Sequence, residues 1–136
     1  MSQKRVPKKQ ASTQHGKYAP YIAGLVARER RRRRRLRGRA TLAMEVARQA
    51  ADLLRQHYDV TRVRLFGSVL RPEYFHERSD IDLAVEGLPP EAYLRAWALL
   101  NGSSPDFKCD FEIDLVDRHD CLPYIWEAVE REGVDV

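Results

Sequence analysis

The sequence predicts an α/β fold, a small twisted mixed sheet flanked by helices, with a long basic helix at the N-terminal end. Three runs with the alternating apolar pattern of strands lie at residues 60–66, 81–85 and 111–116. A helix is predicted over residues 90–101, with Gly102 as its stop. A last helix is predicted to follow an N-cap at Asp120 and to end at Gly133.

The long N-terminal helix is predicted to have Pro20 in its first turn and to run to about His57. Its second half carries apolar residues every three or four positions, the spacing of a stripe that faces a core. These residues are Leu36, Ala40, Ala43, Ala47, Ala51, Leu54 and Tyr58. Gly38 weakens a helix by about 1 kcal/mol relative to alanine, which leaves a break at that position open.

The formal net charge of +4 hides a sharp division along the chain. Residues 1–39 carry fourteen Lys or Arg against one acid, whereas residues 40–136 carry ten against nineteen acids. The low apolar content at the start predicts a disordered basic tail over residues 1–19. An arginine-rich helical arm over residues 20–39 and a folded domain over residues 40–136 are expected to follow.

The arginines between Arg30 and Arg39 have three interpretations. Six consecutive cations attract a phosphate backbone, so nucleic acid is one candidate partner. However, no aromatic residues lie between these arginines to stack on bases, and the second interpretation is a solvated charged extension of the helix. The third interpretation is a docking arm for an acidic protein surface.

The features that bear most directly on function lie in the middle of the chain. Gly67 and Ser68 end an apolar strand in a turn, which offers backbone N–H groups and a hydroxyl to a phosphate. Asp80 and Asp82 then open the next strand, and residues two apart on a strand point to the same face, roughly 6.6 Å apart. Two such carboxylates repel unless a cation lies between them, and oxygen-only ligation suits Mg²⁺. Together these residues predict a site for a metal-bound nucleoside triphosphate.

A third carboxylate is expected from the last predicted strand. If Phe111, Ile113 and Leu115 face the core, Asp114 faces the opposite way. On a strand beside Asp80 and Asp82, Asp114 would complete the three carboxylates that suit a two-metal site with one shared ligand.

In these motifs the chain resembles the minimal nucleotidyltransferases of the DNA polymerase β superfamily, over roughly residues 40–136. The shared pattern is Gly67-Ser68, a spacer, Asp80-Ile81-Asp82 and the later Asp114. The resemblance implies a nucleotidyltransferase fold and transfer of AMP from ATP to a hydroxyl, with two Mg²⁺ ions.

The resemblance also gives each site residue a role. Asp80 and Asp82 would hold the metals that bridge the triphosphate, and Asp114 would bind the second metal and help to take the proton from the attacking hydroxyl. Gly67 and Ser68 would hold the terminal phosphates. Arg71, three residues after Ser68, would assist them.

The acceptor is expected to come from another molecule, because barely twenty residues follow Asp114. In this respect the chain resembles stand-alone minimal nucleotidyltransferases, many of which are antitoxins paired with a HEPN-domain toxin, and the resemblance implies AMP transfer to a tyrosine of that toxin. Two alternatives stay open. One is a catalytically idle module that neutralises a partner by contact, and the other is transfer to a small molecule or an RNA end.

Composition excludes several other classes. No apolar run approaches the length of a membrane span, and no signal-peptide pattern follows the basic N-terminus. Cys109 and Cys121 make neither a disulfide framework nor a zinc site. We therefore expect a cytoplasmic protein with no membrane partner.

Overall fold

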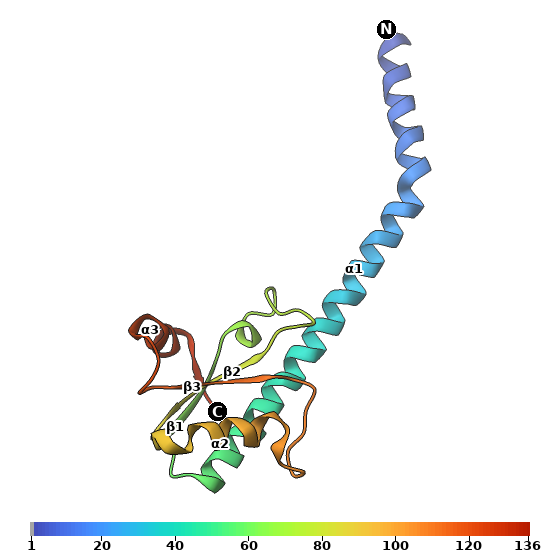
Figure 1. Ribbon diagram of the computed structural model, residues 1–136. Coiled ribbons are helices and arrows are strands. Elements are labelled where there is room, and N and C mark those ends of the chain that lie inside the picture. Colours follow the sequence, from blue (N-terminus) through green and yellow to red (C-terminus); the bar gives the residue numbers. More distant parts are fainter. Residues whose placement is uncertain (1) are drawn as a thin grey trace. The chain divides into compact units, whose positions relative to one another are not determined.

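A computed structural model describes the backbone of residues 2–136 and the side chains of residues 16–136 (Figure 1). In chain order the elements are α1 (Ser2–His57), β1 (Arg62–Phe66), the 3₁₀ turn η1 (Ser68–Leu70), β2 (Ile81–Glu86), the 3₁₀ turn η2 (Pro90–Ala92), α2 (Tyr93–Ala98), the π-helical turn η3 (Leu99–Ser103), β3 (Ile113–Asp117), α3 (Pro123–Glu132) and β4 (Val134–Asp135). The chain forms two compact units, residues 1–35 and residues 36–136, which are described separately. In the described part, no helix is both long and apolar enough to cross a membrane.

The second unit is built on a four-stranded sheet in the order β3-β2-β1-β4. β2 pairs with β3 in parallel, whereas β1 is antiparallel to both β2 and β4. The mixed sheet that the sequence predicts is therefore confirmed, and helices flank it (Figure 1). β4 has only two residues, too few to show a strand pattern in sequence, and the sequence analysis missed it.

The two faces of the sheet differ in character. One face is apolar and packs against the second half of α1 and against α2. Its buried strand residues are Val63, Leu65, Ile81, Leu83, Val85, Ile113 and Leu115. The opposite face carries Arg62 and Arg64 on β1, Asp82 on β2 and Asp114 on β3, because strand side chains alternate. α3 lies over the β1 side of this polar face, where Glu130 pairs with both arginines.

The second half of α1 supplies one wall of the core. Six of the seven predicted stripe residues are buried, and Tyr58 packs partly buried against the same cluster. The helix is continuous through Gly38 and ends at His57, so the predicted end is confirmed and no break occurs. α1 begins at Ser2, so Pro20 lies inside the helix and the prediction that it stands in the first turn is wrong. The predicted disorder of residues 1–19 falls mostly on residues whose side chains are not described, and it stays a prediction.

The start of α3 differs from the sequence prediction. Asp120 is not the N-cap; the N-cap is Leu122, with Pro123 as the first helical residue. The backbone N–H groups of Asp120 and Cys121 both donate to the carbonyl of Asp117, which closes a turn before the helix. Proline at the first helical position is pre-organised for a helix start and needs no side-chain cap.

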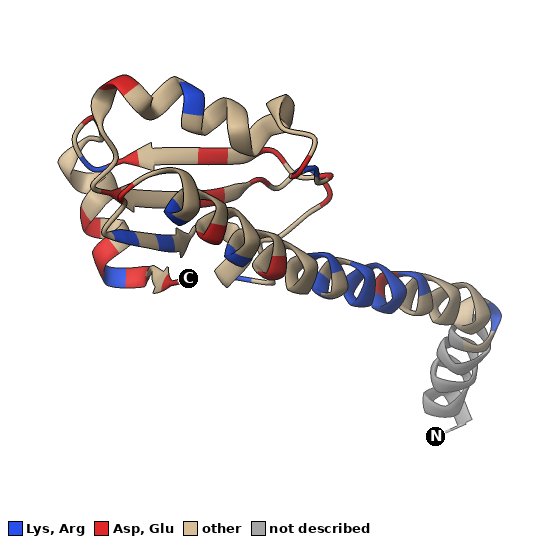
Figure 2. Ribbon diagram, turned by 90° about the horizontal axis from the view of Figure 1, so that it is seen from below, with Lys and Arg blue, Asp and Glu red and all other residues tan. Residues whose placement is uncertain are grey.

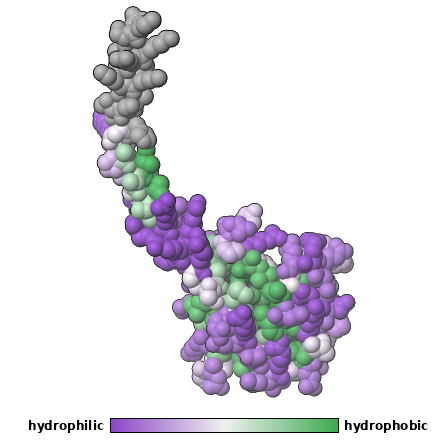
Figure 3. Space-filling model, turned by 180° about the vertical axis from the view of Figure 1, so that it is seen from behind, coloured by the Kyte–Doolittle hydropathy of each residue, from purple (hydrophilic) through white to green (hydrophobic). Residues whose placement is uncertain are grey.

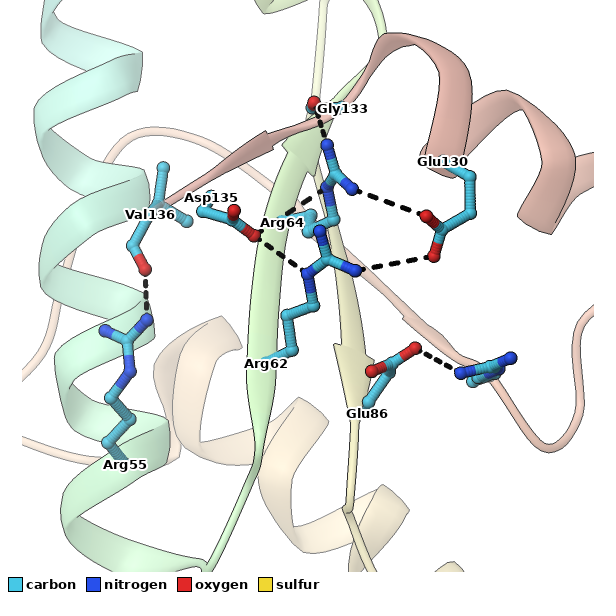
Figure 4. Close-up of polar contacts among 9 residues, drawn as sticks. Arg55, Arg62, Arg64, Glu86, Glu130, Gly133, Asp135 and Val136 are labelled. Carbon is cyan, nitrogen blue, oxygen red and sulfur yellow. Dashed lines mark hydrogen bonds and ion pairs between the residues drawn. The ribbon is translucent and has the colours of Figure 1, made fainter.

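A network of arginines holds the end of the chain against β1 (Figure 4). Arg62 Nε donates to Asp135 Oδ1 at 2.9 Å, and Arg64 donates to the carbonyl of Gly133. Arg55 of α1 donates to the carbonyl oxygen of Val136. These contacts tie α1, β1, α3 and β4 together although the residues are far apart in sequence.

Replacing Leu54 tests the α1 wall. Leu54→Ala removes a fully buried side chain, so we expect the free energy of unfolding to fall by about 2–5 kcal/mol. Leu42→Ala is the matched control on the same helix, because Leu42 is 52% exposed, and it should change stability by less than about 0.5 kcal/mol. Urea denaturation of both variants measures the difference; equal losses would show that α1 does not pack as described.

Candidate functional site

Two of the predicted carboxylates are direct neighbours in the sheet. Asp82 on β2 and Asp114 on β3 are register partners in the parallel pair. The adjacent pairs, Ile81 with Ile113 and Leu83 with Leu115, are buried on the other face. Burial of these apolar pairs fixes the register, because a slip of one residue would turn them to the opposite face. The core therefore forces the two carboxylates together.

The electrostatics of Asp82 reflect this crowding. The pKa of Asp82 is raised to about 7, first by burial, then by the charges of Asp114 and Asp80 and by a hydrogen bond with Asp114. Asp80 precedes β2 and is exposed, and Asp114 is exposed as well. Burial and the neighbouring carboxylates thus act in the same direction and favour the protonated form of Asp82.

Gly67 brings the turn after β1 against this carboxylate. Its φ of +83° is a conformation that residues with a side chain rarely adopt. A Cβ built on Gly67 would lie 2.1 Å from Asp82 Oδ2, far inside van der Waals contact. Only glycine lets the turn approach so closely, and Ser68 then begins the short turn η1.

The loop between η1 and β2 is ordered by Ser79, which sequence reasoning did not single out. Ser79 is buried, and its Oγ accepts a hydrogen bond from the backbone N–H of His76 at 2.9 Å. Its own N–H donates to the carbonyl of His76 at 3.1 Å. This closed loop delivers the chain to Asp80, the next residue. His76 thus has a loop-forming role through its backbone.

A second residue that was missed, Asn101, holds the strand that carries Asp114. Its Nδ2 donates to the carbonyl of Ile113 at 2.9 Å, and its Oδ1 accepts from the N–H of Ile113 at 2.9 Å. The Tyr93 hydroxyl adds a bond of 2.6 Å to the carbonyl of Leu115. Both backbone anchors flank Asp114. Sequence patterns do not reveal such side-chain-to-strand contacts, since they join residues more than ten positions apart.

Arg71 lies beyond η1, and its guanidinium pairs with a partner from another element. Its Nη2 lies 2.5 Å from Glu132 Oε1 at the end of α3. To bind a triphosphate, as the sequence predicts, Arg71 would have to exchange its ion pair with Glu132 for a phosphate.

The donor chemistry of the carboxylates fits a hard divalent cation. Asp82 and Asp114 supply only oxygen atoms, and their mutual repulsion would be relieved by a cation between them. Among residues 16–136, no group of three His, Cys, Asp or Glu side chains is already arranged to hold a metal ion. The pair Asp82 and Asp114 is thus the part of the site that the fold builds, and Asp80 stands beside it.

Comparison with known protein families decides the class. A family model described as polymerase beta, nucleotidyltransferase, matches residues 48–136. The chain belongs to this nucleotidyltransferase family. No curated protein matches the sequence.

Solved structures resemble this nucleotidyltransferase as well. One, the crystal structure of a toxin–antitoxin with AMP-PNP, is 27% identical with a TM-score of 0.51, over 62% of this chain and 67% of that chain. Another, a mutant of the toxin–antitoxin MntA-HpeT, is 24% identical with a TM-score of 0.52, over 65% of this chain and 70% of that one. The second likeness concerns the fold alone.

The close approach of Gly67 can be tested against a second strained glycine of this nucleotidyltransferase. Alanine at Gly67 or at Gly102 meets a positive φ and costs about 1–3 kcal/mol of strain. Only at Gly67 does the new Cβ also displace Asp82, since nothing lies within 4 Å of a Cβ at Gly102. We expect Gly67→Ala to abolish binding of Mg²⁺-ATP in calorimetry and Gly102→Ala to retain it. Equal affinities would remove Gly67 from the site.

The raised pKa of Asp82 predicts a pH dependence of stability in a chelating buffer. An unfolded chain loses the Asp82 proton near its ordinary pKa of 3.8, whereas the folded chain keeps it to about pH 7. The stabilising contribution is thus complete below pH 3.8 and is lost as the pH rises through about 7. Asp82→Asn has no carboxyl group to ionise at this position, so it should not lose stability in this way as the pH rises.

Asp82→Asn should therefore have a higher melting temperature than the wild type at pH 8, and the difference between the two melting temperatures should become smaller towards pH 5. Thermal denaturation at both values measures it. Asp106→Asn, at an exposed loop carboxylate, is the matched control and should show no such change. A gap for Asp82→Asn that does not depend on pH would contradict the assignment.

Proposed function

We propose that this nucleotidyltransferase transfers AMP from Mg²⁺-bound ATP to a hydroxyl, and that the acceptor is a tyrosine of a HEPN-domain toxin. The observation that carries the proposal is the register pairing of Asp82 with Asp114, beside Asp80 and against Gly67. A toxin–antitoxin structure with a bound ATP analogue is among the similar solved structures, which supports both the nucleotide and the partner class.

Each site residue takes a role that its position supports. Asp82 and Asp114, with Asp80, would hold two Mg²⁺ ions, which when bound neutralise charge on the triphosphate and lower the pKa of an attacking hydroxyl. Asp114 is the more exposed of the register pair, so it would accept the proton of the incoming tyrosine hydroxyl. The backbone at Gly67 and Ser68 would bind the terminal phosphates.

Arg71 would complete the binding of the phosphates. In this structure its guanidinium pairs with Glu132. The pair is half-exposed, and exposed ion pairs contribute little to stability. Exchange of the Glu132 carboxylate for a phosphate oxygen is therefore a small change for the fold, and it leaves the positive charge at the site.

A second candidate function is neutralisation of a partner by contact alone. The observation that favours it is that no three described side chains are already arranged around a metal position. A contact-only module, however, has no need of two carboxylates in register or of a glycine with a φ of +83° pressed against one of them. These features support the transferase.

Removal of the metal and of Asp114 tests the proposal. ATP should bind measurably with Mg²⁺ and not with a chelator, because the carboxylates otherwise repel the triphosphate. Asp114→Asn should abolish labelling of the acceptor by labelled ATP while the melting temperature is unchanged or slightly higher. Asp106→Asn, an exposed loop carboxylate, should label at the wild-type rate.

Mass spectrometry of the labelled protein, from a mixture with the product of the neighbouring gene, identifies the modified residue. Wild-type labelling by Asp114→Asn at saturating Mg²⁺ would contradict the catalytic assignment. Neutralisation of the toxin by that variant, without any label, would favour the contact-only function.

A further inference from the structure

The first compact unit contains two successive blocks of the helix α1 with opposite character. The apolar block, residues 18–27, has no charged residue, and the arginine block, residues 30–35, has nothing but arginine. Figure 3 shows the two blocks one after the other along the helix, hydrophobic and then strongly hydrophilic. Both belong to one unit, residues 1–35.

The apolar block leaves large side chains in solvent. They lie at helical spacing on one side and are between 43% and 65% exposed: Tyr18, Tyr21, Ile22, Leu25 and Val26. The remaining positions of the block are Ala, Pro or Gly. A helix segment that is apolar all round is typical of one that becomes buried. Exposed patches of this kind mark interaction sites.

The arginine block surrounds the helix. Successive residues of an α-helix are turned by about 100°, so six consecutive arginines point in all directions. All six are exposed, and Figure 2 shows this stretch as a run of basic residues. Glu29 pairs with Arg32 at 3.7 Å and with Arg33 at 3.1 Å. Residues 16–35 carry eight cations and one carboxylate, a formal charge of +7.

The combination limits the partner. Nucleic acid would bind the arginines through its phosphates, and those contacts leave the exposed aliphatic side chains of the apolar block uncovered. In a parallel pair of such helices from two copies, the two arginine blocks would lie side by side and repel each other. A lipid surface suits a helix with separate apolar and cationic faces, whereas here the two characters follow one another along the axis. A protein groove that is apolar inside and acidic at its mouth satisfies both blocks.

We infer that residues 18–35 form a docking helix for such a groove on the acceptor protein, which rests on the proposed function for the identity of that protein. The apolar block enters the groove, and the arginines meet carboxylates at its mouth. The helix thereby recruits the acceptor to the same chain that carries the carboxylates, a task that the site residues do not perform.

Full-length variants with matched controls test the inference. Leu25→Asp places a charge in the apolar block, and Leu42→Asp is its control at an equally exposed leucine of the same helix, outside the block. Arg31→Glu with Arg34→Glu reverses charge in the arginine block, and Arg48→Glu is the control on the same helix. The affinity for the HEPN-domain protein of the proposed function is measured by calorimetry, and AMP transfer to it is measured separately.

The expected result is at least a tenfold loss of affinity for Leu25→Asp and for the double arginine variant, with Mg²⁺-ATP affinity retained and both controls at the wild-type value. Wild-type affinity should also fall as salt rises from 50 to 300 mM, and it should fall less for the double variant. Affinities unchanged in both block variants, or no binding by the wild type, would overturn the inference.

Separate arms distinguish the other partners and the proposed function. The variants are also tested for binding to a 20-nucleotide single-stranded RNA and to phosphatidylcholine–phosphatidylglycerol vesicles. The inference would be overturned if either of these depended on the two blocks while binding of the acceptor protein did not. Binding of the acceptor protein through the blocks without any AMP transfer would leave the docking helix standing and contradict the proposed function alone.

Discussion

The burial of apolar side chains across the parallel pair β2 and β3 is the constraint on which the rest of the structure depends. On the opposite face it sets Asp82 beside Asp114, although burial and then the charges of Asp114 and Asp80 raise the pKa of Asp82. The strand register is nevertheless fixed, because the same strands bury Ile81, Leu83 and Ile113 on the opposite face. The core thus stabilises an arrangement that the polar face alone would reject, and that arrangement is the feature suited to bind a cation.

Contacts around the carboxylates come from separate parts of the chain and limit how far the site can relax. Gly67 closes against Asp82 from the β1 side, and Asn101 holds β3 at the residue before Asp114. At the other edge of the sheet, the arginines of β1 anchor α3 and β4, and α3 in turn presents Glu132 to Arg71. A site built in this way keeps its repelling groups in place, and binding of a cation and a triphosphate, as proposed, would relieve the repulsion.

The division of charge along the chain follows the two compact units, of which the first is basic and the second acidic. The second unit has a formal negative charge and the first a formal positive charge, so an acidic partner would be attracted by the first unit. The apolar and arginine blocks of α1 supply a surface of that kind, with chemistry unlike that of the carboxylate site. Separation of recruitment from chemistry would let a small nucleotidyltransferase act on a protein acceptor.

The sequence by itself determined the fold class and the end of α1, because alternation and helical spacing record directly which side chains must be buried. Its motifs predicted the mixed sheet and the carboxylates of the candidate site, and the alternation of its strand turned Asp114 away from the core, whereas the pairing of β2 with β3 placed Asp114 beside Asp82. Only the tertiary structure decided that Leu122 rather than Asp120 caps α3, that β4 exists, and that Ser79, Asn101 and Glu132 support the site. These features depend on hydrogen bonds and ion pairs of single side chains or on pairing with a distant strand, and such contacts leave no periodic pattern in a sequence.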